Sequence, residues 1–326
     1  MESKLRQAEE NLHAIDLIAE SRDLDEVKGR RRREEPAEVK QVVYDHFRLS
    51  FSEYWKYRPK LLGPFNVIAQ SQHFYCLDVE FSKHEIWAAV AGCDGNKAPG
   101  SNGFYTTCYQ KGWKFMKTDI ITFVKEFFAN SSLVGGLNSS FITLVPKKDD
   151  PIGNAQAAFL GGRNILGGIL IANKVVDWWK KSRRKGLALK LDFQKVYDTV
   201  NWNYLFQMLS NFGFSAKWVN WICSCLSLAK ISMLVNGSPT LEFFPQKGLK
   251  QSDPLSPLLF NVLAEGLNLL LARAKGLGLI KGVIIGSNAI NISHLQFADN
   301  TIIFCEAEWS EVLTVKRILR CFEDLG

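Results

Sequence analysis

Two polar residues interrupt an apolar run near the C-terminus of the chain. The segment HLQFADNTIIF, residues 294–304, holds Asp299 and Asn300 between two stretches of strand-forming residues. This pattern predicts a β-hairpin with the polar pair at its turn. A carboxylate on such a tip is held rigidly and faces outward, so Asp299 is a candidate ligand for a divalent metal ion. Its neighbour Asn300 is a neutral amide, where a second carboxylate would complete an acidic pair.

A second candidate carboxylate, Asp192, closes the apolar run LALKLD. A strand fixes the direction of a side chain at its end, which makes this a usual position for a metal ligand. The same position is also ordinary for a turn or helix-capping residue, and that alternative stays open. Two carboxylates from two strands of one sheet, together with a triphosphate, are the parts of a two-metal site for phosphoryl transfer.

A third segment, KGLKQSDPLSPLLFN, places Gln251 in a turn before a helix that we expect to begin near Pro254 or Leu255. Asp253 and the proline give this turn good helix-capping chemistry, which alone would account for them. The functional alternative is a turn whose backbone and Gln251 side chain lie beside a nucleotide.

The composition favours a polyanionic partner. The 326 residues carry a net charge of +7, with an isoelectric point near 8.9, although many basic proteins bind no nucleic acid. Seven cysteines show no zinc-ligand spacing, which favours free thiols in a reducing compartment. The N-terminus is charged rather than a secretory signal, and polar residues interrupt the longest apolar stretch, 255–271. We therefore expect an intracellular protein, nuclear or cytoplasmic, without a membrane segment; the basic run 28–33 is either a nuclear address or a solvated helix face.

The order of helical and strand patterns predicts an α+β fold rather than a doubly wound sheet. A helix is expected from Ser82, where Glu85 completes a capping box. Asn236-Gly237 is the strongest local hairpin signal in the chain. Further helices are expected at about 105–130, 165–182, 202–212, 218–228, 257–275 and 309–325, with strands at 141–147 and 187–193.

Six motifs in order resemble one family. They are NKAPGSNGF, LVPKKDDP, AFLGGRNI, LKLDFQKVYDTVNW, KGLKQSDPLSPLLFN and LQFADN. The chain from about Phe81 to Gly326 resembles the reverse transcriptase region of LINE-type (non-LTR) retrotransposons, with the plant lineage the closest match. The resemblance implies a polymerase right hand, with a palm made of an antiparallel sheet and packed helices, partial fingers and no thumb. It also implies RNA-directed DNA polymerase (nucleotidyltransferase) chemistry, in which a primer 3′-hydroxyl attacks a dNTP on an RNA template.

The resemblance assigns the catalytic and metal-binding residues. Asp192 matches the first palm carboxylate, and Asp299 matches the leading carboxylate of the FADD box. Both are thereby implied ligands of Mg²⁺, or of Mn²⁺. Asn300 occupies the third catalytic position, where the family carries a second carboxylate.

The resemblance also assigns the substrate-binding residues. Tyr197 matches the residue that lies under the sugar and excludes ribonucleotides, and Gln251 matches the nucleotide-side residue of the second palm motif. Lys147 stands where a fingers lysine would meet the triphosphate, and Arg163 stands near the template or nucleotide. The implied partners are an RNA template, a DNA primer and dNTP, with no membrane and no stable protein partner to infer.

Four departures from the family pattern indicate a degenerate, truncated copy that is inactive. Asn300 removes a negative charge from a site built for two cations, and Ser252 replaces the glycine after Gln251. A stretch with an Arg-Pro-Ile-Ser motif is absent between Pro151 and Gln156, and the chain stops at Gly326 before the primer grip and thumb.

The expected division of the chain is a charged helical linker segment, partly disordered, over 1–80, partial fingers over 81–186 and palm over 187–326. Three functional hypotheses follow: a working reverse transcriptase, an inactive relic of one, and a non-enzymatic nucleic-acid-binding protein. The last would use basic faces that include Lys180-Lys181 and Arg183-Arg184-Lys185.

Overall fold

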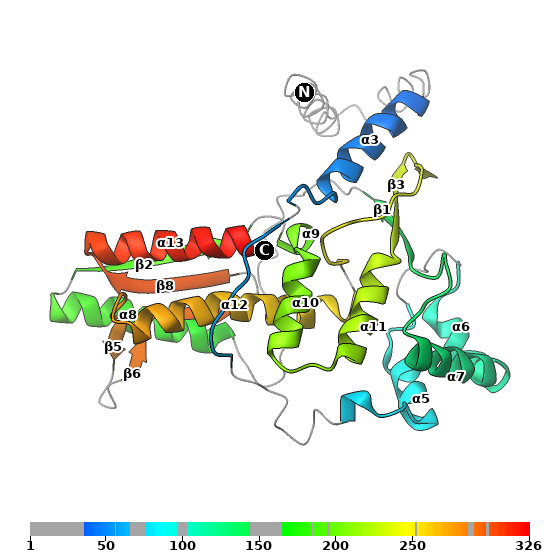
Figure 1. The fold of residues 1–326 in the computed structure, drawn as a ribbon, viewed down its shortest axis with the longest axis horizontal. Coiled ribbons are helices and arrows are strands. Elements are labelled where there is room, and N and C mark those ends of the chain that lie inside the picture. The colour runs from blue at the N-terminus through cyan, green and yellow to red at the C-terminus, as the bar shows by residue number, and fades with distance from the viewer. Residues whose placement is uncertain are drawn as a thin grey trace. The chain divides into compact units, whose positions relative to one another are not determined.

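The computed structural model describes most of the chain in two compact units. The described residues are 36–55, 57–65, 76–96, 103–143, 165–183, 185–193, 196–251, 253–285, 290–297 and 300–326. The first unit combines 1–52, 78–151 and 220–246, and the second combines 53–77, 152–219 and 247–326. Both mix helices with strands, as the α+β prediction requires (Figure 1).

The second unit is built on a three-stranded antiparallel sheet. Its strands are β2 (Gly186–Asp192), β7 (His294–Phe297) and β8 (Asn300–Glu306), and β8 lies in the middle. Strands β7 and β8 pair with Phe297 opposite Asn300. The hairpin predicted from the residues 294–304 is therefore confirmed, although Asn300 begins β8 and does not lie in the turn as predicted. All seven residues of β2 pair with β8, from Gly186 opposite Glu306 to Asp192 opposite Asn300.

Alternating side chains of β8 enter two different cores, because successive residues of a strand point to opposite faces. Ile303 and Cys305 pack with α12 (Ser256–Gly276) and α13 (Trp309–Leu325). Phe304, between them, packs with α8 (Ile165–Ser182), β5 (Val283–Ile285) and β6 (Ile290–Ile292). Both faces of the sheet are thus covered, which explains the apolar run TIIFC (Figure 1).

Helix α12 contains the most apolar long stretch among the described residues. By length and composition it could cross a membrane, but 44% of its most apolar window is buried inside the structure, and a core helix passes the same test. Leu263, Leu267 and Leu271 are all buried within the unit. This packing agrees with the expectation that 255–271 is not a membrane segment.

Helix α10 (Trp202–Asn211) packs against α12 at a glycine. A Cβ atom at Gly266 would overlap the hydroxyl oxygen of Tyr204. That hydroxyl is buried without a hydrogen-bond partner in the described part of the chain, and burial raises the pKa of Tyr204. Gly266 is therefore required by the close approach of the two helices. The short helix α9 (Val196–Thr199) precedes α10, and α11 (Ala216–Ser227) follows it.

The described part of the first unit contains a smaller sheet, residues 220–227 of α11 and four further helices. Strands β1 (Ser139–Thr143), β3 (Lys230–Val235) and β4 (Ser238–Pro239) form the sheet in the order β1-β3-β4. Asn236 and Gly237 both have positive φ, at 53° and 77°, which suits the tight turn predicted there. Strands β1 and β3 are parallel, a pairing that was not predicted. A connection of more than 80 residues separates them, which allows a parallel crossover.

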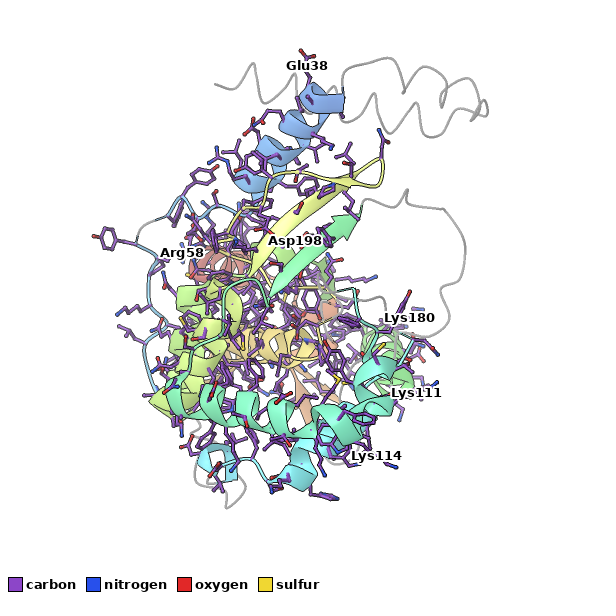
Figure 2. All side chains as sticks on the ribbon, turned by 90° about the vertical axis from the view of Figure 1, so that its right-hand side faces the viewer. Glu38, Arg58, Lys111, Lys114, Lys180 and Asp198 are labelled. Carbon is purple, nitrogen blue, oxygen red and sulfur yellow. The ribbon has the colours of Figure 1, made fainter. Side chains whose placement is uncertain are left out.

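The four further helices described in the first unit are α3 (Pro36–Ser50), α5 (Lys83–Gly92), α6 (Thr106–Lys111) and α7 (Trp113–Asn130). The capping box of Ser82 and Glu85 at α5 is confirmed. The single helix expected over 105–130 is divided at Gly112, which ends α6 and begins α7. A Cβ atom at Gly112 would lie 2.7 Å from the Cys108 carbonyl oxygen, so only glycine fits this junction. Lys111 and Lys114 are exposed on either side of it (Figure 2).

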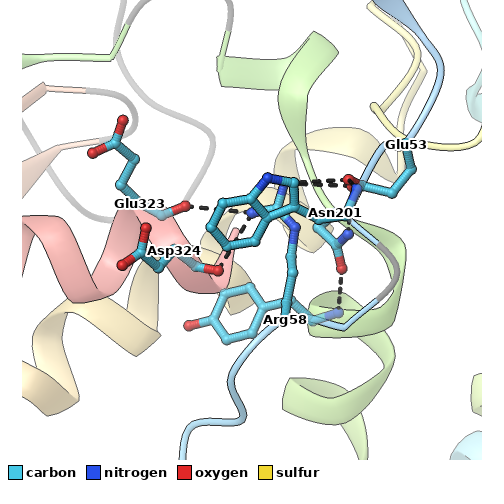
Figure 3. A network of polar contacts seen from close by, with 7 residues as sticks. Glu53, Arg58, Asn201, Glu323 and Asp324 are labelled. Atoms are coloured by element: carbon cyan, nitrogen blue, oxygen red, sulfur yellow. Dashed lines mark hydrogen bonds and ion pairs between the residues drawn. The ribbon is translucent and has the colours of Figure 1, made fainter.

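An extended segment of the second unit, 53–65, is tied to the ends of two helices (Figure 3). Asn201 caps α10 by accepting from the Tyr204 N–H, and its amide donates to the Glu53 carboxylate at 2.7 Å. Arg58 pairs with Glu53 at 3.4 Å and donates to the last carbonyl groups of α13, those of Glu323 and Asp324. One charged network thereby anchors α10 and α13 to the same stretch of chain.

The substitution Gly266→Ala should destabilise the protein by about 1–3 kcal/mol, because the new methyl group overlaps Tyr204 in a packed core. Urea denaturation followed by circular dichroism measures this. Gly276→Ala on the same helix is the matched control, since a Cβ atom there meets open space. The double variant with Tyr204→Phe should recover most of the loss, and a Gly266→Ala protein as stable as the parent would contradict this packing.

The stability contributed by Glu53 should depend on pH. Burial acts to raise its pKa, but the Trp55 N–H, Asn201 and Arg58 together hold the pKa below the ordinary value of 4.5. A carboxyl group with a lowered pKa stabilises the fold above its unfolded pKa and loses this contribution as the pH falls through the folded pKa. Glu53→Gln should therefore cost about 1 kcal/mol at pH 7, and this cost should shrink as the pH falls through the folded pKa of Glu53.

The control for this measurement is Glu265→Gln, which removes a carboxylate from the exposed face of α12. Its effect should be small at pH 7 and at pH 3. A Glu53→Gln loss that stays constant between pH 7 and pH 3 would show that the charge of Glu53 is not what holds the network.

Candidate functional site

The end of the β2–β8 ladder brings two of the predicted site residues together. Asp192 is the last residue of β2 and Asn300 is the first of β8, and they are direct partners in the antiparallel register. Directly opposed residues in such a ladder have Cα atoms about 4.5–5.5 Å apart. Only the backbone of Asp192 is within the described part of the structure. The β7–β8 turn that precedes Asn300 contains Asp299, which lies outside the described residues.

Backbone hydrogen bonds fix the segment 247–251 against the chain that follows β2. The Leu249 N–H donates to the Tyr197 carbonyl oxygen at 2.6 Å, and the Gly248 N–H donates to that of Val200 at 2.8 Å. The Trp202 indole N–H donates to the Gly248 carbonyl oxygen at 2.7 Å. Gly248 has φ of 92°, a conformation that side chains disfavour. The two motifs that contain Tyr197 and Gln251 are thus held together as one structural element.

Side-chain contacts reinforce this junction. The Tyr197 ring stacks on the Phe260 ring of α12, with centroids 5.2 Å apart and planes inclined by 36°. The Gln251 side-chain amide donates to the Asp198 carboxylate at 3.4 Å, while the rest of Gln251 is exposed. Asp198 is also labelled in Figure 2. Contact with α12 therefore orients the ring of Tyr197, and contact with α9 orients the amide of Gln251.

The start of α12 differs slightly from the expectation. The helix begins at Ser256, between the two starts that were expected, near Pro254 or Leu255 and at about residue 257, and Leu255 is its N-cap without a side-chain hydrogen bond. The Asp253 carboxylate instead accepts from the Leu255 N–H at 2.8 Å. Asp253 thus organises the turn before the helix rather than capping the helix itself.

The structure relates four of the predicted residues and is silent on the others. Asp192 and Asn300 are neighbours at the end of the sheet, and Tyr197 and Gln251 are neighbours at the α9 junction. Lys147, Arg163 and Asp299, together with Ser252 and the basic run 28–33, lie outside the described residues. Within the described part, no group of three or more His, Cys, Asp or Glu side chains could hold a metal ion.

Two contributors to the site were not singled out from the sequence. Asp198 follows Asp192 by six residues within the same motif. A second acidic residue in that motif was a signal that it makes a polar contact close to the site. Phe260 carried no such signal, because an aromatic residue on a helix ordinarily belongs to the core. Its contact with Tyr197 depends on how α12 packs against α9.

Comparison with known proteins gives the family. Residues 137–326, more than half of the chain, match the model of the reverse transcriptase (RNA-dependent DNA polymerase) family. An uncharacterized mitochondrial protein of Arabidopsis thaliana is 43% identical over 68 residues, which cover 21% of this chain and 56% of that protein. The transposon TX1 uncharacterized 149 kDa protein of Xenopus laevis is 21% identical over 284 residues, covering 76% of this chain and 21% of that protein.

A third relative is the retrovirus-related Pol polyprotein from the type-1 retrotransposable element R2 of Popillia japonica. It is 31% identical over 143 residues, which cover 42% of this chain and 19% of that protein. The chain thus spans between about a fifth and about half of the length of these relatives. Among solved structures, apo telomerase from Candida tropicalis, truncated from its C-terminal domain, matches with a TM-score of 0.35 and 15% identity, covering 66% of this chain and 38% of that one.

The family match covers the three motifs that contain Asp192, Gln251 and Asp299. Hydrogen bonds from Leu249 and Gly248 hold the first two of these motifs together. The chain belongs to the reverse transcriptase (RNA-dependent DNA polymerase) family and carries the reverse transcriptase domain of a non-LTR retrotransposon protein.

Proposed function

We propose that the second unit is the palm of an RNA-directed DNA polymerase and that part of the first unit is its fingers. The observation that carries this proposal is the register of β2 and β8, which puts the backbone of Asp192 beside the residue that follows Asp299. Two carboxylates at adjacent strand ends could hold divalent metal ions. Such ions neutralise the negative charge that develops on phosphate oxygens during phosphoryl transfer. We also propose that the retrotransposon from which this domain derives belongs to the plant lineage.

The donor set at this sheet end fits Mg²⁺, with Mn²⁺ as an alternative. Both ions prefer oxygen ligands, and Mg²⁺ keeps part of its water shell while it binds one or two carboxylates and substrate phosphates. Asp192 and Asp299 would hold the metal. Bound there, the ions would neutralise charge on the triphosphate and activate the primer 3′-hydroxyl.

The chain's own residues would position the substrates. The Tyr197 ring, backed by Phe260, would lie under the sugar of the incoming dNTP and exclude a 2′-hydroxyl. Gln251, oriented by Asp198, would lie beside the nucleotide. Lys147 would meet the triphosphate, and Arg163 the template or nucleotide. The net charge of +7 supports an RNA template and a DNA primer as partners.

We further propose that catalysis is lost or severely reduced in this chain because of Asn300. An amide in the third catalytic position removes one negative charge from a site for two divalent cations. Loss of metal-ion stabilisation of several kcal/mol corresponds to a rate lowered by about a hundredfold or more. Nucleic-acid binding without catalysis is the second candidate function, and the positive net charge favours it.

The substitution Asn300→Asp should raise primer extension by about a hundredfold or more, since it restores the missing charge. The measurement is extension of an oligo-dT primer on a poly-A template with Mg²⁺ or Mn²⁺. Adding Asp192→Asn to that variant is the control and should abolish extension. If Asn300→Asp stays silent while the protein still binds the template, the chain acts as a binding protein, and the defect lies elsewhere than in Asn300.

In the Asn300→Asp background, Tyr197→Val should increase the use of ribonucleotides relative to deoxynucleotides by about tenfold or more, because it removes the ring beneath the sugar. The matched control Tyr197→Phe keeps a ring that can stack on Phe260 and should leave the selectivity unchanged. Competitive incorporation of rNTP and dNTP measures both. Equal selectivity in all three proteins would remove Tyr197 from the nucleotide site.

A further inference from the structure

A small cavity lies in the second unit at the end of β2 that is opposite to Asp192. Its volume is about 120 Å³, well below the roughly 300–1,000 Å³ of sites that take a whole drug-sized ligand. A single planar ring suits this size. The lining residues come from α8, from β5 and the residues just before it, and from the end of the ladder where β2 begins and β8 ends: Trp178, Trp179, Lys185, Lys281, Gly282, Ile284 and Glu306.

One wall of the cavity is aromatic. Trp178 and Trp179 are neighbours near the end of α8, and both are only partly buried. Trp179 lies so close to Gly186 that a Cβ atom there would overlap the indole, and its edge meets the Phe304 ring with centroids 6.1 Å apart. The indole of Trp179 is therefore fixed in place, which lowers the entropy lost when a ring stacks on this wall.

The facing wall is polar. The Lys281 ammonium group bonds to the Glu306 carboxylate at 2.7 Å and lies 3.8 Å from that of Glu308. The hydrogen bond to Glu306 raises the pKa of Lys281, so the amine stays charged. An ion pair of this kind presents donors and acceptors side by side. The edge of a nucleobase, which also carries both, is chemically complementary to it.

Exposed cations follow the aromatic wall along the chain, and one of them, Lys185, lines the cavity. Lys180, Lys181, Arg183 and Lys185 follow the two tryptophans and are all exposed, and Lys180 is labelled in Figure 2. The Lys185 carbonyl oxygen accepts from the Ala307 N–H at 3.0 Å, which ties this basic run to the end of β8. Basic side chains around a stacking surface are the features by which proteins bind single-stranded nucleic acids.

We propose that this cavity is a second nucleic-acid site, which holds one base of a single-stranded RNA or DNA while the exposed cations Lys180, Lys181, Arg183 and Lys185 bind the adjoining phosphates. The seven residues of β2 separate it from the Asp192 end of the ladder by about 20 Å. A nucleic-acid strand bound in this cavity therefore lies away from the base pair that would form at the catalytic end. The site needs no metal ion and no polymerase activity, so it stands independently of the proposed function.

The test is fluorescence anisotropy of the full chain with labelled 12-nucleotide RNA, the same DNA sequence, its duplex, and a strand with abasic positions. Single strands of both kinds should bind more tightly than the duplex, and abasic positions should weaken binding by about tenfold. The triple variant Lys180→Gln, Lys181→Gln, Lys185→Gln should lower the slope of log K against log salt by about 2, because each phosphate contact on a single strand contributes about 0.7.

The matched control removes three exposed cations from α13 with Lys316→Gln, Arg317→Gln and Arg320→Gln, and it should leave that slope unchanged. A 4-thiouridine RNA should photocrosslink to the peptide that contains Trp178 and Trp179, and Asp192→Asn should crosslink equally well. A slope lowered equally by both triples, duplex bound as tightly as single strand, or crosslinks confined to other peptides would overturn the proposal. A preference for RNA over DNA would show which of the two nucleic acids this site binds.

Discussion

The pairing of β2 with β8 is the interaction on which the rest of the second unit depends. Seven consecutive residue pairs fix the register, so a slip of one residue would exchange the two faces of β8. Ile303 and Phe304 would then enter the wrong cores, and both are completely buried. The register that is enforced by packing is therefore also the register that brings Asp192 beside Asn300. Core packing and site geometry are two consequences of one constraint.

Main-chain hydrogen bonds fix the path of the turn 247–249, and side-chain contacts reinforce it. Leu249 and Gly248 bond to the carbonyl groups of Tyr197 and Val200, so residues of quite different type could stand in this turn without changing its path. Gly248 is the exception, since its φ of 92° favours glycine. The junction also receives support from outside the motifs, because Asn201 is hydrogen-bonded to Glu53 in the extended segment.

Local signals predicted elements well and pairings less well. The capping box at Ser82 and the turn at Asn236-Gly237 follow from a few neighbouring residues, and the structure has both. The parallel pairing of β1 with β3, by contrast, joins segments more than 80 residues apart and leaves no local pattern. Candidate site residues were found because motifs carry residue types in a fixed order. The contact of Tyr197 with Phe260 depends on helix packing, which residue types alone do not determine.

The exchange of a carboxylate for an amide at position 300 affects chemistry and stability in opposite directions. Like charges directly opposed across two antiparallel strands are destabilising when no cation lies between them. Asn300 opposite Asp192 removes that repulsion from the metal-free protein. A polymerase that retains its metal ions gains nothing from this change, since the ions already neutralise the pair. A chain that no longer bound them would fold more easily with the amide, so the proposed loss of catalysis at this position would leave the β2–β8 ladder intact.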